Sequence, residues 1–228
     1  MTTTAKAPSK PPRRTQESRS AATRARLLEV TVDSLYTSGY AATTTTVVAE
    51  NAGVSRGAML HQFPTKVDLM LFVVQAVYEE DIRLYHAALD PIADPKERLR
   101  AFPRAVWEVL CRPAGVAVLE IMQGSRSDPV LSERLKPLQT QIEKDSFKQA
   151  AALLSWKNRR ASPEKARLLV WAFRGLSVAR LLTDKPAEIE KSVNLMSELL
   201  IATIEDAPDI EAPAARKKRA TSARPKSG

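Results

Sequence analysis

Apolar side chains recur every three or four residues through most of the chain between residues 20 and 205. That spacing places them on one face of an α-helix, whereas a half-buried strand would alternate apolar and polar positions. The first stripe consists of Leu28, Val32 and Leu35, and it is followed by Gly39, a residue type that commonly ends helices. The pattern therefore predicts an all-α protein with about nine helices.

Capping residues and prolines mark where the later helices begin. Thr65 precedes Asp68 by three residues, which is the spacing of a capping box, and a long helix with an apolar face is expected over 66–88. Further starts combine an Asp or Ser with a proline directly after it, because proline is well tolerated in the first turn of a helix. Together with the apolar pattern, these starts predict helices near 95–111, 114–124, 129–156, 163–183 and 186–205.

The expected elements divide the chain into four segments. Residues 20–66 carry three helices, and residues 67–205 form a larger helical bundle. Both ends, 1–19 and 206–228, are rich in Pro, Ser, Ala, Lys and Arg and have few large apolar groups to offset the entropy of ordering, so a disordered basic arm and a disordered basic tail are expected. Much of the net charge of +9 lies in them. The basic run at 216–219 either attracts phosphates without sequence preference or only keeps the tail solvated.

Cysteine content and the N-terminal segment bear on location. The single cysteine cannot form an intramolecular disulfide, which favours a reducing cytoplasm. The first residues lack the apolar core of a signal peptide, and no run approaches the roughly 18 apolar residues that span a bilayer. We therefore expect a soluble, cytoplasmic protein without a membrane partner.

The sequence contains few residue patterns that are typical of catalysis or cofactor binding. Ser162 and Lys165 have Ser-x-x-Lys spacing, but Pro163 and Glu164 lie between them, and the start of a helix explains all four residues. Two histidines and one cysteine are too few for a Cys/His metal cluster, and neither a dinucleotide-binding glycine motif nor a P-loop is present. We expect no enzymatic activity, no catalytic residues, no metal site and no cofactor.

Two glycines interrupt the segment 47–66, which is otherwise suited to helix. Gly53 separates short helices expected at 44–51 and 55–62, and glycine readily takes the positive φ that a sharp turn between two helices needs. Ser55 can cap the second helix. The segment therefore predicts a helix-turn-helix.

Gly57 lies inside the second of these helices rather than at its end. A glycine there costs about 0.8–1 kcal/mol relative to alanine, but it allows the backbone to approach a ligand closely. With Arg56 and Ala58 it makes a small surface carrying one long cation, which suits insertion of the start of the helix into the major groove of DNA. Arg56 could pair with guanine O6 and N7, and Ala58 could contact a thymine methyl group.

Polar side chains near this surface could reach the DNA backbone, since hydroxyls, amides, cations and helix N-termini are common phosphate ligands. They are Thr44, Thr46, His61, Gln62 and Lys66. Taken alone, the threonine run at 43–46 is equally well explained by helix capping and solvent exposure, and His61 by an ordinary surface histidine. Their combined spacing favours double-stranded DNA as a partner.

The residues of this region resemble the N-terminal domain of TetR/AcrR-type transcriptional regulators. The resemblance covers about residues 20–70 and rests on Gly39, Tyr40, Thr43, Val48, Ala49, Ala52 to Met59, His61 and Phe63 to Lys66. It implies DNA-facing roles for Thr44, Thr46, Arg56, Gly57, Ala58, His61, Gln62 and Lys66. It also implies a repressor that dimerises through its last two helices, binds a palindromic operator, and leaves DNA when a small molecule binds the C-terminal bundle.

One position departs from the family. Leu60 stands where the family usually has tyrosine, so a hydroxyl that would bind phosphate is missing. The backbone contacts would then depend more on His61, Lys66 and the basic arm. The departure also keeps an alternative open, namely a helical protein that binds small molecules or partners and has lost specific DNA binding.

The last two expected helices carry broad apolar stripes. In 186–205 the stripe consists of Ile189, Val193, Met196, Leu200 and Ile204. Two adjacent helices of this kind suit a two-fold four-helix interface in a homodimer, although the stripes could instead pack within one subunit. For the unidentified effector we nominate Trp107 and Met122 as lining residues, while noting that large side chains at helical spacing are more often plain core.

Overall fold

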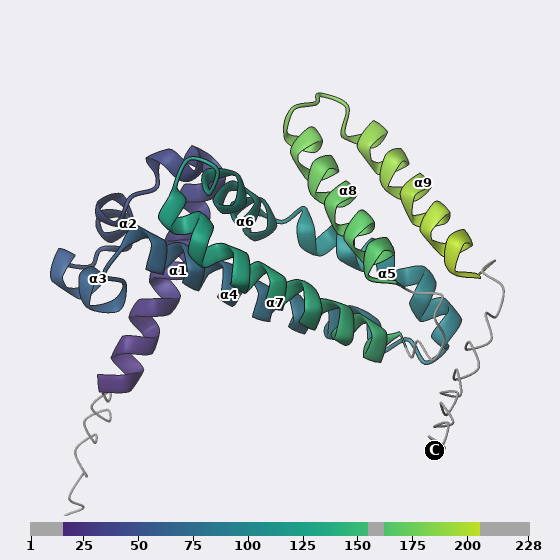
Figure 1. Ribbon diagram of the computed structural model, residues 1–228, viewed down its shortest axis with the longest axis horizontal. Helices are drawn as coiled ribbons and strands as arrows, with labels where there is room; N and C mark the ends of the chain where they lie inside the picture. The colour runs from purple at the N-terminus through teal and green to yellow at the C-terminus, as the bar shows by residue number, and fades with distance from the viewer. Residues whose placement is uncertain (1–15, 155–161, 206–228) are drawn as a thin grey trace, which may run out of the picture.

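The computed structural model describes residues 16–154 and 162–205, and within these ranges it is entirely helical, as the apolar pattern predicts. Figure 1 shows the helices in order. They are α1 (Gln16–Ala42), α2 (Thr45–Ala52), α3 (Arg56–Gln62), α4 (Lys66–Leu89), α5 (Pro95–Leu110), α6 (Pro113–Gly124), α7 (Pro129–Leu153), α8 (Pro163–Leu181) and α9 (Pro186–Glu205).

Disorder was expected at both ends of the chain, and the N-terminal end differs in part from that expectation. Helix α1 begins at Gln16, inside the segment 1–19 that was expected to be a disordered arm. Helical structure therefore reaches further toward the N-terminus than the composition indicated. The rest of that arm and the tail at 206–228 lie outside the described residues.

The expected helix starts are present with their caps. Thr65 and Asp68 form a complete capping box at the start of α4, where the Thr65 side chain accepts from the Asp68 N–H and Asp68 accepts from the Thr65 N–H. Asp94, Asp128 and Ser162 each accept a backbone N–H at the starts of α5, α7 and α8, and each is followed by proline. These local signals place four of the helix starts.

Helix α1 is interrupted near its C-terminal end. Gly39 has φ 76° and ψ 177°, a conformation that glycine adopts far more easily than other residues. The predicted break at Gly39 is therefore confirmed, although a further short helical piece follows it before α2.

Two hydrophobic clusters make up the core. One joins α1, α2 and α3 to the first half of α4 and to α6 and α7, and it includes Leu27, Leu35, Met59 and Ile121. The other joins the end of α4 to α5, α8 and α9. Helix α4 thus belongs to both clusters.

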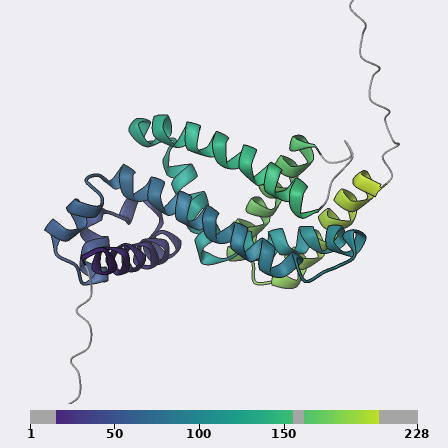
Figure 2. The same ribbon diagram turned by 90° about the horizontal axis from the view of Figure 1, so that it is seen from below.

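The molecule is elongated. Helices α2 and α3 lie at one end, and the antiparallel pair α8 and α9 lies at the other, with α4 and α7 running between them (Figure 1). The view from below shows the same separation along the long axis (Figure 2). No helix in the described part of the chain has the length and apolar character needed to cross a membrane.

Candidate DNA-binding and effector sites

The turn between α2 and α3 has the geometry of a helix-turn-helix. Gly53 has φ 67° and ψ 29°, in the left-handed region, and its N–H bonds to the carbonyl of Glu50 at 3.1 Å. The Val54 N–H bonds back to the Ala49 carbonyl at 3.0 Å. Ser55 then caps α3 by accepting the Ala58 N–H at 3.2 Å. The roles predicted for Gly53 and Ser55 are confirmed.

Helix α3 is anchored by its inner face. Met59 and Phe63 are almost fully buried, and they pack with residues of α1 and α2 in the first cluster. Phe63 also lies against Phe72 of α4, with a centroid separation of 4.8 Å. The Arg24 guanidinium of α1 lies over both rings, at 5.0 Å and 4.4 Å from their centroids. These contacts fix the position of α3 relative to α1, α2 and α4.

The opposite face of α3 is open to solvent. Arg56, Gly57, Ala58, Leu60 and His61 are all exposed. A Cβ added at Gly57 would meet nothing within 4 Å, and the backbone of Gly57 is not left-handed. Neither packing nor conformation within the subunit therefore requires a glycine at this position.

The threonine run at 43–46 divides between structural and exposed positions. Thr43 is fully buried, where its hydroxyl bonds to Ser34 Oγ at 3.0 Å and to the Gly39 carbonyl at 2.8 Å. Thr44 is exposed and caps α2 by accepting the Val47 N–H at 3.2 Å. Thr46 is exposed in the first turn of α2. Thr44 and Thr46 therefore keep exposed surface that a DNA backbone could reach, whereas Thr43 does not.

Two other expected phosphate ligands are engaged within the subunit. Gln62 donates from Nε2 to Ser20 Oγ of α1 at 2.9 Å. Lys66, whose side chain was expected to reach the DNA backbone, is half-buried. Its Nζ donates to the Tyr40 carbonyl at 2.6 Å and lies 3.9 Å from the centre of the Tyr40 ring. Burial lowers the pKa of Lys66, while the Asp128 charge opposes that shift.

Tyr40 is the centre of a junction between the N-terminal helices and the bundle. Its hydroxyl donates to Asp128 Oδ2 at 2.7 Å, at the start of α7. Its ring packs on Gly124 of α6 so closely that an added Cβ there would lie 2.3 Å from the Tyr40 Cγ. Burial, followed by the hydrogen bond to Asp128, raises the pKa of Tyr40. Sequence reasoning identified Tyr40 only as part of a motif, because nothing in its spacing indicates partners on α6 and α7.

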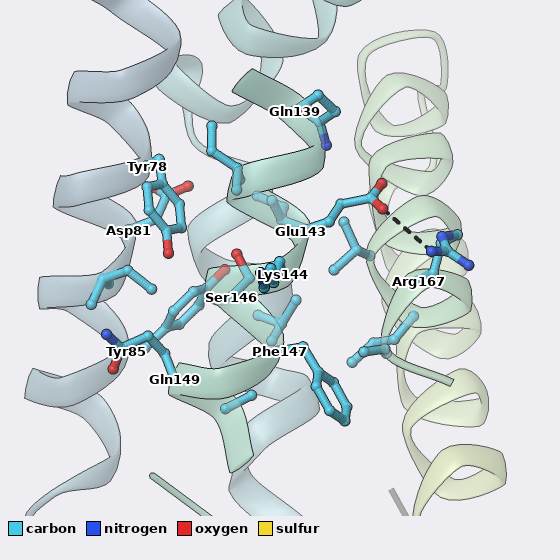
Figure 3. A pocket seen from close by; sticks show the side chains of 18 of the residues that line it. Tyr78, Asp81, Tyr85, Gln139, Glu143, Lys144, Ser146, Phe147, Gln149 and Arg167 are labelled. Atoms are coloured by element: carbon cyan, nitrogen blue, oxygen red, sulfur yellow. Dashed lines mark hydrogen bonds and ion pairs between the residues drawn. The ribbon is translucent and has the colours of Figure 1, made fainter. Parts of the chain in front are cut away.

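A cavity of about 540 Å³ lies in the C-terminal bundle between α4, α5, α7 and α8. Figure 3 shows Tyr78, Asp81 and Tyr85 of α4 on one side of it and side chains of α7 on the facing side, with Arg167 of α8 beyond. Most of the remaining lining is apolar. The bundle in which an effector was expected to bind thus contains a cavity.

Charged groups are built into the wall of this cavity. Asp81 is 9% exposed, and its Oδ1 accepts from Arg112 Nη2 at 2.6 Å. Burial raises the pKa of Asp81 to about 7, against the opposing effect of Arg112 and Arg174. Arg112 is the residue before α6, so this ion pair ties α4 to the start of α6. The sequence analysis missed these residues, because isolated charges in helices usually lie on solvated faces.

The two nominated lining residues differ in outcome. Met122 lines the cavity. Trp107 is 1% exposed, packs edge-on against Phe173 with a centroid separation of 5.8 Å, and donates from Nε1 to Glu190 at 3.2 Å. Trp107 is not among the lining residues, so its nomination is wrong; it belongs to the core between α5, α8 and α9.

Helices α8 and α9 share an exposed apolar surface. Trp171, Leu195 and Leu199 are 43%, 57% and 54% exposed. A shallow groove between the two helices is lined by Ala172, Gly175, Leu176, Ser192, Leu195, Met196 and Leu199. Val193, Leu200 and Ile204 of α9 instead pack inside the subunit, so the apolar positions of α9 serve two different surfaces.

Comparisons with known proteins agree with the N-terminal geometry. Residues 27–73 match the family model described as bacterial regulatory proteins, tetR family. An uncharacterised HTH-type transcriptional regulator of Mycobacterium tuberculosis is 26% identical over 191 residues, covering 83% of this chain and 98% of that protein. The HTH-type transcriptional regulator CymR of Pseudomonas putida is 27% identical over 194 residues, covering 83% of this chain and 94% of CymR.

Solved structures extend the likeness to the whole fold. A transcriptional regulator of Rhodococcus sp. RHA1 superposes with a TM-score of 0.61 at 19% identity, over 78% of this chain and 95% of that one. The multidrug binding protein EbrR, solved in complex with imidazole, gives a TM-score of 0.54 at 26% identity, over 85% of this chain and 98% of EbrR. The C-terminal bundle is therefore shared as well as the helix-turn-helix.

Proposed function

The chain belongs to the TetR family of transcriptional regulators, and from this premise we propose that it is a repressor that binds a palindromic operator as a homodimer and leaves it when a small molecule binds. Members of this family are DNA-binding regulators and generally not enzymes.

The solvent-facing start of α3 is the observation that carries the DNA-binding part of the proposal. Arg56, Gly57 and Ala58 form a narrow, exposed surface beyond the Ser55 cap, with the first free N–H groups of the helix beside it. Such an end fits a major groove, where a guanidinium can pair with guanine O6 and N7. Thr44, Thr46 and His61 would contact phosphates around it, and Gln62 and Lys66 would hold the helix in place through Ser20 and Tyr40.

Dimerisation through α8 and α9 is supported by the apolar surface that these helices expose. One short recognition helix contacts few base pairs, whereas the two helix-turn-helix heads of a dimer (residues 20–66 of each subunit), spaced about 34–36 Å apart, contact successive major grooves. The groove around Gly175 can receive a side chain from a second copy of the surface, as a two-fold interface requires. The α9 stripe named in the sequence analysis, Ile189, Val193, Met196, Leu200 and Ile204, packs within the subunit, as the alternative held. The surface that supports dimerisation is instead made by other positions, among them Leu195 and Leu199, which are exposed.

Release by an effector is supported by the contacts of α4 and α6, which connect the cavity to the helix-turn-helix. Helix α4 lines the cavity with Tyr78, Asp81 and Tyr85, and its first residue, Lys66, bonds to Tyr40 near α2. Helix α6 is tied to α4 through Arg112 and packs on Tyr40 through Gly124. A ligand that favours another position of α4 or α6 would therefore change the spacing of the two heads, with a coupling of about 1–3 kcal/mol.

Selection of genomic DNA fragments by the purified protein tests the proposal. We expect enrichment of a palindrome whose half-sites are separated by about one helical turn or a multiple of it. Fragments without two-fold symmetry would contradict the dimeric arrangement. A protein that enriches no fragment but binds small molecules in the bundle would instead be the carrier considered above, in which the exposed Leu60 marks the loss of DNA binding.

A further inference from the structure

One cation in the effector cavity has few partners of its own. Arg174 lies on α8, lines the cavity and keeps part of its surface accessible there. Among the described residues, its hydrogen bonding is a single long contact from Nη1 to the Gly115 carbonyl at 3.5 Å, and the Trp171 ring lies 5.9 Å away. A guanidinium carries five N–H donors, so most of the hydrogen-bonding capacity of Arg174 is unused.

The carboxylates of the lining do not balance this cation. Asp81 is held by Arg112 at 2.6 Å and also acts electrostatically on Arg174, so one carboxylate serves two guanidinium groups. Glu143, the other lining carboxylate, pairs with Arg167 at 3.3 Å (Figure 3). Asp81, Arg112, Arg174 and the Glu143–Arg167 pair together leave an excess of one positive charge, and the exposed lining residues Lys144 and Lys148 add to it. Enclosing an unbalanced charge is costly unless a counter-charge accompanies it.

The rest of the cavity suits an apolar body. Val77 of α4 and Phe102, Val106 and Leu110 of α5 are among its lining residues, and all four are nearly buried. Ligand pockets of this size typically bury most of a small ligand against apolar side chains and orient it with a few polar groups. Here Arg174 is the least exposed of the lining cations, and it has spare donors.

We propose that the effector is an amphipathic organic anion, whose carboxylate accepts hydrogen bonds from Arg174 while its apolar part fills the cavity. The proposal rests on the function proposed above and names the chemical class of the ligand for that site. A carboxylate matches the planar donor fork of arginine and would supply the counter-charge that the wall lacks.

The competing assignment is a cationic ligand. Gln139 Oε1 is buried without a hydrogen-bond partner among the described residues, and it lies one turn from Glu143 on α7. Together with Tyr78 these groups could receive an ammonium. The two assignments place the polar end of the ligand against different helices, α8 for the anion and α7 for the cation, so they can be separated by substitution.

Calorimetric titration of the full-length protein with three matched probes tests the proposal. The probes are 4-phenylbutyrate, 4-phenylbutan-1-ol and 4-phenylbutylamine, which share one apolar body and differ in charge. We expect the carboxylate to bind at least about tenfold more tightly than either of the others, since a hydrogen bond to a charged group contributes about 1.5–3 kcal/mol. Equal affinities, a preference for the amine, or no binding by any probe would overturn the proposal.

Variants of two arginines on the same helix locate the preference. In Arg174→Met the preference for the carboxylate should disappear while the alcohol still binds, which shows that the cavity is intact. Arg167→Met is the matched control, because Arg167 also lines the cavity but lies at its exposed side in an ion pair with Glu143, and it should keep the preference. Arg174→Lys, which retains the positive charge, should keep part of the preference for the carboxylate. A preference that survives Arg174→Met would contradict the assignment.

Operator binding, measured with and without the carboxylate probe, separates this proposal from the proposed function. If the carboxylate binds through Arg174 but leaves operator affinity unchanged, the ligand assignment stands and effector control is wrong. If operator binding is intact and the carboxylate has no preference, DNA recognition stands and the ligand assignment is wrong.

Discussion

Replacing Gly57 by alanine should separate the stability of the free protein from its affinity for DNA. Within the subunit the added Cβ meets no atom within 4 Å, so no clash is expected. Alanine in place of glycine stabilises a helix by up to about 0.8–1 kcal/mol and also restricts the unfolded chain. The free energy of unfolding should therefore stay unchanged or rise by up to about 1 kcal/mol.

The same methyl group should weaken binding to the operator. If the start of α3 lies against base edges, the Cβ of residue 57 pushes the head away and stretches the contacts of Arg56. A loss comparable to one base contact is about 1–3 kcal/mol for each half-site, which is about 5- to 150-fold. Thermal or denaturant unfolding measures the first effect, and a fluorescence anisotropy titration with a labelled operator measures the second.

Thr140→Ala is a suitable control for this experiment. Thr140 is an exposed residue of α7, and alanine there also improves helix propensity without touching α3. It should leave operator affinity unchanged in the absence of effector. If Gly57→Ala bound the operator as tightly as the unaltered protein does, Gly57 would not face DNA and the docking of α3 would be wrong.

Two further predictions concern the bundle. Leu199→Glu places a charge in the apolar surface shared by α8 and α9, so the protein should become monomeric in analytical ultracentrifugation. Leu182 is 82% exposed and lies outside the groove, so Leu182→Glu should leave the dimer intact. A dimeric Leu199→Glu protein would refute the interface. The pKa of Asp81 is raised from 3.8 to about 7, so the folded protein holds a proton there that the unfolded chain has lost. The free energy of unfolding should consequently fall between about pH 4 and pH 7, by up to about 1 kcal/mol per pH unit from this group. In Asp81→Asn the pH dependence should be shallower, and equal slopes in denaturant titrations across that range would exclude the effect.

Local signals were sufficient for most of the fold. Caps such as Thr65 with Asp68, and prolines after Asp94 and Asp128, set helix starts through bonds within four residues, and they can be read from the sequence. Gly53 is equally local, because the left-handed turn depends on its own backbone. These features depend on bonds between neighbouring residues and not on tertiary packing.

Positions that depend on distant partners were predicted less well. Thr43 and Thr44 are adjacent and chemically identical, yet Thr43 is buried against Ser34 while Thr44 is exposed. Lys66 is drawn to Tyr40, 26 residues earlier in the chain. Trp107 is core because Phe173 and Glu190 meet it from α8 and α9. None of these contacts has a periodicity or spacing that the sequence displays.

The cavity charges show the same limit. Asp81, Arg112 and Arg174 come from α4, the start of α6 and α8, and each resembles an ordinary surface charge when its own helix is considered alone. Only the packing of the three elements encloses them. Sequence reasoning therefore identified the helical bundle that contains the cavity but not the charged groups enclosed there.

The central claim, that Arg56 reads a base in each half-site, is tested most directly by combining Arg56→Ala with symmetric base substitutions in the selected operator. The unaltered protein should lose about 1–3 kcal/mol for each half-site in which one particular guanine is replaced, and Arg56→Ala should be indifferent to that replacement while still discriminating at the other positions. Arg83→Ala, an exposed arginine paired with Glu80 on α4, should behave like the unaltered protein. If Arg56→Ala kept the full discrimination of the unaltered protein at every position, Arg56 would not contact a base.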